Sequence, residues 1–371
     1  MNLVKHYFFQ IIIVFICFSF FSFSQTSLSS DDALKKYKSI TAKMEQSFPE
    51  NDFKTYRRES FSEQQLQTYL IQLFQRLDLL PFIEGHYFFK MHSYLHSGNW
   101  FKELGFPEES IKWYKAFFNY YNKYEDYLSD NEKQELVEMI TYSYSMQAYN
   151  YAKIGQLDSV ALEHKKNIAF IKDVNTILNP SAFNNYGLFF YWNKKDLDSA
   201  LIYFKKAYAI TKERFPNHTL IGSIRDNIAD VYSDKNKPEK ALPLYKENFE
   251  LYRNVKNKKL NDYDVKRLIS AGAQVIETEV KLNQLKQAQQ TLQDLKKIFV
   301  TPKFNKRIRG NTKLEFLNAQ ETLYVAQNKI GDAYTISKIR HKIVDSLNTV
   351  SKITDMKWQD ELNTISLDRV H

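Results

Sequence analysis

The chain has 371 residues, which is too long for one compact core of typical size. Of these residues, 43% are hydrophobic and 26% are charged, which is an ordinary composition for a folded protein. It contains only 9 glycines, 8 prolines and no alternating run rich in Val, Ile and Thr, which predicts an all-α protein and excludes a sheet-based fold. Its net charge of +9 comes from 52 basic and 43 acidic residues interleaved along the chain, which indicates a solvated helical surface rather than a nucleic-acid-binding protein.

The first 24 residues have the layout of a secretory signal peptide. Lys5 precedes an apolar run at 8–23, and Ser22 and Ser24 supply the small residues that a signal peptidase needs before Gln25. The apolar run has 16 residues, fewer than the roughly 20 that a membrane-spanning helix needs. We therefore expect cleavage after Ser24 and a protein located in the periplasm or outside the cell. The alternative is an uncleaved segment that anchors the chain in the inner membrane.

Cys17, the only cysteine of the chain, lies inside this N-terminal segment. Cleavage would leave no cysteine, and therefore no disulfide, thiolate nucleophile or cysteine metal site. The sequence also lacks the GxxxxGK[ST], GxGxxG, GxSxG and HExxH patterns of nucleotide, hydrolase and zinc sites. We therefore expect no enzymatic activity and no cofactor.

Residues 25–84 are predicted to form a capping region of two amphipathic helices. Ser30 and Asp31 are candidate caps of the first helix, at 31–48. Pro81 is expected to end the second helix, because proline interrupts helical hydrogen bonding.

Three histidines follow in the stretch HYFFKMHSYLH. His92 and His96 are four residues apart on one helix face, with His86 upstream, and histidines at this spacing can bind a metal ion. However, no carboxylate stands at a helpful spacing on that helix. The expected role is therefore local hydrogen bonding within an aromatic-rich helix, and no metal site is predicted.

A short motif recurs along most of the chain. It consists of an aromatic or polar residue, several polar residues, and a small residue that opens an amphipathic helix. An early copy ends at Ser110, and later copies, about 40 to 50 residues apart, are YAKIGQLDSV, YWNKKDLDSA, YSDKNKPEKA, EVKLNQLKQA and YVAQNKIGDA. Repetition at this period predicts helical hairpins that bury a continuous core by stacking.

These copies resemble the tetratricopeptide repeat, a helical hairpin that stacks into an α-solenoid with a right-handed superhelix. The resemblance covers about six repeats at 85–343 and leaves 344–371 as a C-terminal helix. It is strongest between 181 and 252, where the turn between repeats is also similar to that of kinesin-light-chain repeats. The packing positions in this part are Ala200, Phe204, Ala207, Ala241 and Tyr245.

Small residues at these packing positions have a physical reason. The two helices of a hairpin must approach closely, and a residue such as Ala200 permits this while Phe204 fills the space beside the crossing. Asn248 stands where a small residue is usual in the resemblance, and Gln147 and Gln320 stand where apolar residues are usual. The register of the outer repeats is therefore left open.

The first helices of the hairpins line the concave groove in this architecture. The predicted groove residues are Tyr142, Tyr149, Asn185, Phe189, Trp192, Asp226 and Asp230. Tyrosine and tryptophan are favoured binding anchors because they offer a large contact area with few rotatable bonds. The alternative is that Tyr149 and Phe189 pack against neighbouring helices, as aromatic residues at helical spacing usually do.

Asp226 and Asp230 lie one helical turn apart and are expected to be exposed. Together they would attract a basic group of a partner and repel an acidic one. The carboxylate clamp known from this repeat family needs a lysine and asparagine pattern that these positions lack. We therefore expect a protein or peptide partner that does not bind through a free acidic C-terminus.

The most basic stretch, LKKIFVTPKFNKRIRGNTK at 295–313, contains no acidic residue. Its basic residues are Lys296, Lys297, Lys303, Lys306, Arg307, Arg309 and Lys313. Such a cluster suits an acidic protein or lipid surface, and the alternative is a solvated loop between two repeats. Although interleaved aromatic residues also suit single-stranded nucleic acid, export argues against that partner.

Two functional hypotheses follow. The first is an exported, non-catalytic scaffold that binds a protein or peptide in its groove. The second rests on the C-terminal helix, which resembles the segment that follows such repeats in bacterial sensor histidine kinases. That resemblance implies a sensory or regulatory protein that acts through this helix on a membrane signalling partner.

Overall fold

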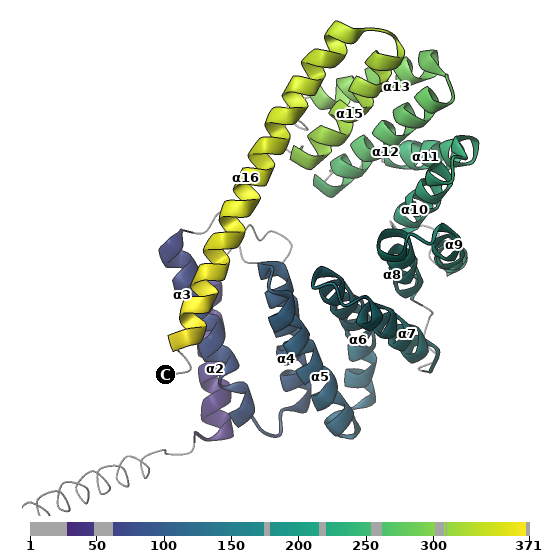
Figure 1. The fold of residues 1–371 in the computed structure, drawn as a ribbon. Coiled ribbons are helices and arrows are strands. Elements are labelled where there is room, and N and C mark those ends of the chain that lie inside the picture. Colours follow the sequence, from purple (N-terminus) through teal and green to yellow (C-terminus); the bar gives the residue numbers. More distant parts are fainter. Residues whose placement is uncertain are drawn as a thin grey trace, which may run out of the picture. The chain divides into compact units, whose positions relative to one another are not determined.

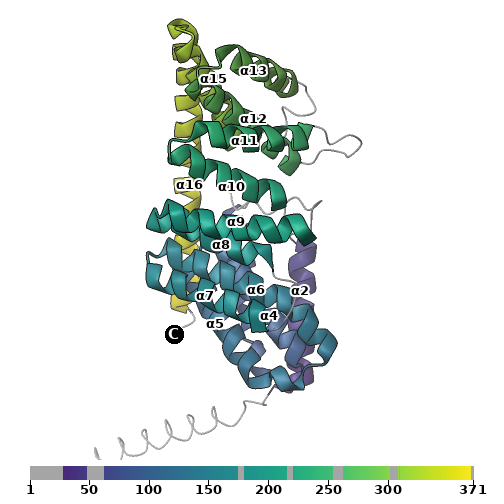
Figure 2. The same ribbon diagram turned by 90° about the vertical axis from the view of Figure 1, so that its right-hand side faces the viewer.

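The computed structural model describes residues 28–47, 62–173, 179–214, 220–253, 262–300, 308 and 310–368. Every regular element in these ranges is a helix, which confirms the all-α prediction (Figures 1 and 2). The predicted signal segment, 1–24, lies outside the described residues. Within the described ranges, no helix combines the length and hydropathy needed to cross a membrane.

The helices divide into two compact units. The first unit comprises Met1–Leu104, Trp113–Lys133 and Lys357–His371, and the second comprises Gly105–Lys112 and Gln134–Met356. The elements of the first unit are α2 (Ser30–Ser47), α3 (Glu63–Leu77), η2 (Leu80–Phe82), α4 (Tyr87–Leu104), most of α5 (Pro107–Tyr124) and η3 (Glu125–Tyr127).

The cap of α2 differs from the prediction by one residue. The Asp32 N–H donates to the Ser29 hydroxyl oxygen at 3.1 Å, so Ser29, rather than Ser30 or Asp31, caps the helix. Ser30 fixes a distant turn instead: its hydroxyl donates to the Glu84 carbonyl at 3.0 Å and accepts from the Glu84 N–H at 2.8 Å.

Helix α3 is bounded by local chemistry at both ends. Ser62 and Gln65 form a reciprocal capping box at its start. Helix α3 ends at Leu77 with Asp78 as its C-cap, before the predicted end at Pro81, which lies in η2.

The second unit is built mainly from successive helix pairs (Figure 2). The pairs are α6 (Asp130–Lys153) with α7 (Leu157–Asp173), α8 (Pro180–Phe189) with α9 (Leu197–Arg214), α10 (Leu220–Asp234) with α11 (Pro238–Arg253), α12 (Asp262–Lys281) with α13 (Leu285–Val300), and α15 (Gly310–Ala326) with α16 (Ile330–Asp368). Helix α8 continues into a π-helical turn, η4 (Phe190–Lys194).

The recurring motif forms the turn inside each of these pairs. One residue takes a left-handed backbone conformation, and these residues are Gly155, Lys195, Asn236, Asn283 and Asn328. In most pairs the N–H of the residue after it donates a hydrogen bond to the carbonyl five residues earlier, as from Lys237 to Tyr232 at 2.8 Å. This bond is typical of the Schellman motif, which ends many helices. After α8 the bond runs from Asp196 to Phe190 at 3.0 Å, one residue farther, because the last turn is π-helical.

The small residues of the motif lie where helices approach most closely. Ala200, Phe204 and Ala207 are fully buried in one cluster, and Ala241 and Tyr245 are buried in the same unit. A Cβ atom added to Gly187 on α8 would lie 2.6 Å from the Phe204 ring on α9. The aromatic side chain therefore occupies the space that the glycine leaves, as expected for a tightly packed hairpin.

Asn248 has a structural explanation at its unusual position. It is fully buried on α11, and its amide nitrogen donates to the Gly222 carbonyl at 2.8 Å. Its amide oxygen accepts from an Arg225 guanidinium nitrogen at 2.9 Å. The amide of Asn248 thus satisfies polar groups of α10 that would otherwise be buried without these partners.

The predicted boundary at 343/344 does not correspond to a break in structure. Helix α16 is one 39-residue helix that starts in the last pair and continues to Asp368. The predicted C-terminal helix is therefore the extension of a repeat helix, because no Gly, Pro or capping motif interrupts the pattern near 344. Ile353 and Met356 on this extension are exposed.

Candidate functional site

The two aspartates of the predicted groove are held by side chains of neighbouring helices. One oxygen of Asp226, Oδ1, accepts from the Asn248 amide nitrogen. The corresponding oxygen of Asp230 accepts from the Tyr245 hydroxyl at 2.5 Å and from the Gln274 amide nitrogen at 3.3 Å. Both aspartates are half-buried, so the expectation of full exposure is wrong. The cause is that α11 packs beside α10 and that side chains of α11 and α12 contribute these donors.

Burial changes the ionisation of both carboxyl groups. Removal from water raises the pKa of Asp226 to about 7, against the hydrogen bond from Asn248, which lowers it. Burial likewise raises the pKa of Asp230 to about 6, while the bond from Tyr245 lowers it. The negative charge of Asp230 also raises the pKa of Asp226, and the charge of Asp234 raises the pKa of Asp230. The pair therefore changes charge near neutral pH.

Polar side chains connect successive first helices on both sides of this pair. We call this set the polar ladder: Asn184 on α8; Ser223, Asn227 and Asp230 on α10; Arg267, Ser270 and Gln274 on α12; and Glu315 on α15. The bonds run from Asn227 to Asn184 at 2.8 Å, from Arg267 to Ser223 at 2.6 Å, and from Ser270 to Glu315. The first helices of four consecutive pairs thus share one row of hydrogen-bonded polar groups.

The negative charge continues along this row beyond α10. Glu277 on α12 has a raised pKa because of burial, and the nearby carboxylates of Glu315 and Asp230 raise it further. The charge of Lys281 partly offsets these effects. Arg267, Glu277 and Glu315 are not among the predicted site residues, because the register of the outer repeats is left open by the sequence. Polar residues recurring on the same face of α12 and α15 were the available signal.

Phe189 does not line a groove. It is only 3% exposed and packs against Tyr186, with ring centroids 5.9 Å apart, and against His164 at 6.0 Å. The same alternative, packing against a neighbouring helix, applied to Tyr149, but this residue is 49% exposed on α6. The packing interpretation therefore holds for Phe189 and fails for Tyr149. Asn185, next to ladder residue Asn184, is half-buried.

The remaining predicted aromatic residues are accessible. Tyr142 is 42% exposed on α6, and Trp192 is 60% exposed in the π-helical turn after α8. The ring of Trp192 packs edge-on against Tyr191 at 4.7 Å, and the Tyr191 hydroxyl donates to Asp234 at 2.6 Å. Trp192 is thus linked through Tyr191 to α10, whereas Tyr142 lies on α6, two helix pairs before the aspartates.

Only part of the basic stretch is described. Lys296 donates to the Tyr324 hydroxyl at 2.9 Å, Lys297 pairs with Asp294 at 3.4 Å, and Lys313 is half-buried on α15. The other four basic residues, Lys303, Lys306, Arg307 and Arg309, lie outside the described residues. An acidic partner for this stretch stays a prediction.

The histidine pair of α4 is close together. The rings of His92 and His96 are 5.9 Å apart, and burial lowers the pKa of His96, with a smaller effect from His92. Among the described residues, no group of three His, Cys, Asp or Glu side chains is placed to hold a metal ion.

The comparison with known proteins agrees with this architecture. Residues 178–254 match the tetratricopeptide repeat family. No curated protein sequence shows significant similarity to the chain. Among solved structures, a STAND signal-transduction ATPase with a tetratricopeptide repeat sensor from Pyrococcus horikoshii is similar, with a TM-score of 0.54 and 13% identity. The match covers 79% of this chain and 44% of that one, so it spans less than half of the ATPase.

A second similar structure is the apo form of RapI, with a TM-score of 0.53 and 14% identity over 85% of this chain and 77% of RapI. Identities this low show a common fold and nothing more specific. The family match at 178–254 coincides with the stretch where the motif is clearest. Together with the helix pairs and their turns, these similarities show that residues 178–254 are similar to tetratricopeptide repeats and that the chain has an all-α solenoid fold.

Proposed function

We propose that the chain is a non-catalytic scaffold that binds a protein or peptide along the first helices of its second unit, and that the partner places a basic group at Asp226 and Asp230. The supporting observation is the way in which the two carboxylates are held. Their described hydrogen bonds use Oδ1 of each residue, and none of these bonds uses Oδ2. A carboxylate already positioned by fixed donors loses little freedom on binding.

The fold supports a binding role in general terms. Tetratricopeptide repeats generally serve as protein-interaction scaffolds, and stacking brings their first helices side by side. The polar ladder provides many donors and acceptors, and Trp192 provides an accessible aromatic anchor near its edge. The acidic groups on α10 and α12 favour a basic partner through charge complementarity.

The test is capture of partners from the envelope fraction of the native host, followed by affinity measurement with each purified partner. We compare the wild type with the double variant Asp226→Asn, Asp230→Asn, which removes charge but keeps similar size and hydrogen-bonding atoms. We expect about tenfold weaker binding and a smaller salt dependence at about pH 8, where both carboxyl groups are ionised. Asp158→Asn on α7, an exposed position, is the control and should bind as the wild type.

Unchanged affinity and salt dependence in the double variant would rule out this binding surface. The described remainder of the basic stretch, at Lys296, Lys297 and Lys313, would then be the next candidate, with an acidic partner. A partner of the two aspartates would be basic and a partner of the basic stretch would be acidic, so the charge of the captured partner distinguishes the two surfaces.

We also propose that the protein is exported, on the basis of the segment 1–24. A partner would then be found in the periplasm or outside the cell. The same segment, if uncleaved, would instead hold the scaffold at the inner membrane.

A second candidate function is a sensory or regulatory role through the C-terminal helix. It is favoured by the 39-residue length of α16, whose extension carries the exposed Ile353 and Met356. Truncation after residue 343 separates the two proposals. Loss of a membrane signalling partner by this truncation, with retention by the Asp226→Asn, Asp230→Asn variant, would favour the sensory role.

A further inference from the structure

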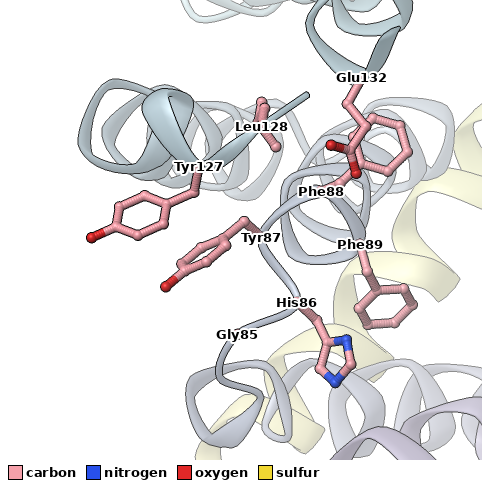
Figure 3. Close-up of a pocket in the computed structure, with 8 residues that line it drawn as sticks. All are labelled: Gly85, His86, Tyr87, Phe88, Phe89, Tyr127, Leu128 and Glu132. Atoms are coloured by element: carbon pink, nitrogen blue, oxygen red, sulfur yellow. The ribbon is translucent and has the colours of Figure 1, made fainter. Parts of the chain in front are cut away.

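The first unit contains a pocket that shares no residue with the polar ladder. Its volume is about 320 Å³, at the lower end of the range for small-ligand sites. Figure 3 shows its lining residues: Gly85, His86, Tyr87, Phe88, Phe89, Tyr127, Leu128 and Glu132. They come from two segments, the turn that leads into α4 and the η3–α6 junction.

One side of the pocket is an aromatic surface. Tyr87 and Tyr127 lie side by side (Figure 3), with ring centroids 4.6 Å apart. Tyr87 also stacks on Tyr124, with ring centroids 5.1 Å apart. Tyr127 is 65% exposed, whereas Leu128 beside it is buried. A large exposed ring that is supported by its neighbours is ready to accept a flat apolar surface at low entropic cost.

The backbone at the other side of the pocket is fixed before any ligand binds. The Ser30 hydroxyl makes two hydrogen bonds to the backbone of Glu84. The Lys90 ammonium group is buried and donates to the Ile83 carbonyl at 3.0 Å. The turn is therefore held from two helices, α2 and α4, and its position does not depend on a ligand.

Glu132 brings a negative acceptor to the pocket. Its Oε2 atom accepts from the Ser129 hydroxyl at 2.7 Å and from the Ser129 N–H at 2.8 Å. These two bonds lower the pKa of Glu132, so its carboxyl group is ionised at neutral pH. The two hydrogen bonds from Ser129 fix the Glu132 side chain through Oε2, and neither of them uses the other oxygen, Oε1.

Donors come from the start of α4. The first helical hydrogen bond of α4 runs from the Lys90 N–H to the His86 carbonyl at 2.9 Å. The N–H groups of the three pocket residues Tyr87, Phe88 and Phe89 precede this bond, so they are not used inside the helix. The pocket thus combines an aromatic face, a carboxylate and the positive end of a helix.

These groups select a neutral ligand with several hydroxyl groups. An anion would be repelled by Glu132, and a cation would face the positive end of α4. A ligand with only acceptors would give Glu132 no donor. A sugar ring meets all three conditions, because its hydroxyl groups both donate and accept and one face of the ring carries only C–H groups. We propose that this pocket binds one pyranose ring of a neutral carbohydrate, with the ring against Tyr127 and a hydroxyl group donating to Glu132.

The test uses the purified protein with neutral trisaccharides as probes: maltotriose, cellotriose, mannotriose and chitotriose. Saturation-transfer NMR detects contact, and calorimetry measures affinity. We expect saturable binding of at least one probe and about tenfold or greater weakening by Tyr127→Ala, which removes the exposed ring. Tyr149→Ala removes a similarly exposed tyrosine from the second unit and should leave sugar binding unchanged.

Glu132→Gln separates the proposed contact from the role of Glu132 as a helix cap. Glutamine can also accept from Ser129 in a capping box, so the fold should be retained while the carboxylate is lost. We expect weaker sugar binding with an unchanged melting temperature. No binding of any probe, or equal binding by the wild type and Tyr127→Ala, would overturn the proposal. Binding of oligoproline or tetramethylammonium in place of all four sugars would also overturn it, in favour of a proline-rich peptide or an organic cation.

Discussion

The Tyr245 hydroxyl on α11 donates a hydrogen bond to the Asp230 carboxylate on α10 at 2.5 Å. The Tyr245 ring is buried among the packing residues, and its hydroxyl reaches the polar ladder. One residue therefore joins the interior of the solenoid to the polar ladder. The charge of Asp230 raises the pKa of Tyr245 in addition to the effect of burial, so the tyrosine stays a donor at all physiological pH values.

Replacement Tyr245→Phe should remove this donor while keeping the buried ring. We expect the unfolding free energy to fall by about 1–3 kcal/mol at neutral pH, because a half-buried carboxylate loses a hydrogen bond. The pKa of Asp230 should rise, since the bond from Tyr245 lowers it. Chemical denaturation and carboxyl NMR titration measure the two effects. Tyr149→Phe, at an exposed tyrosine, is the control, and an equal loss of stability in both variants would contradict this account.

Gly187 should tolerate no side chain. A Cβ atom there would lie 2.6 Å from the Phe204 ring, so Gly187→Ala should destabilise the protein by about 1–3 kcal/mol through overpacking. At Gly331, in α16, an added Cβ meets no atom within 4 Å, so Gly331→Ala should be neutral or stabilise by up to about 1 kcal/mol. Thermal and denaturant unfolding compare the two variants. If Gly187→Ala is as stable as Gly331→Ala, the close approach of α8 and α9 is wrong.

His164 should make stability depend on acid pH. Burial lowers its pKa to about 4, whereas the unfolded chain binds the proton near pH 6.5. Between these values the unfolded state binds more protons, so stability should decrease as pH falls from about 6.5 to 4, by about 3 kcal/mol in total. His164→Phe should remove this contribution and keep ring packing against Tyr186 and Phe189. If the difference in unfolding free energy between the wild type and His164→Phe stays constant across this pH range, the lowered pKa of His164 is contradicted.

Asp226 and Asp230 should have the opposite effect on stability. Their folded pKa values of about 7 and about 6 lie above the ordinary value of 3.8, so the folded state binds more protons in this window. Their contribution is therefore present below about pH 4 and decreases as pH rises through 6 to 7. The variant Asp226→Asn, Asp230→Asn should gain stability relative to the wild type as pH rises from about 4 to 8. Denaturation curves across that range provide the measurement, and a constant difference would show that the groups are not shifted.

Export can be tested without any functional assay. If the segment 1–24 is a cleaved signal peptide, the protein isolated from its native host should begin at Gln25. N-terminal sequencing or intact mass gives the answer. An intact Met1 in the membrane fraction would support the anchored alternative.

The hairpins could be predicted from sequence because they depend on local chemistry. A small residue such as Ala200 and a turn residue such as Asn236 recur at fixed places, and each has one structural role. The binding surface depends on which way each helix face points. Phe189 was misplaced because the spacing of aromatic residues along α8 does not show which of them pack against α7, where His164 lies. The burial of Asp226 and Asp230 depends on donors from α11 and α12, which short-range patterns do not place.

The most direct test of the central claim is the affinity for a captured partner, measured between about pH 5 and pH 8 for the wild type and for Asp226→Asn, Asp230→Asn. The wild type should bind more weakly as pH falls, with the change centred between about 6 and 7, because protonation removes the charge of both carboxylates. The double variant should bind weakly and without this change. Equal affinities and the same pH dependence for both proteins would contradict a binding role for the two aspartates.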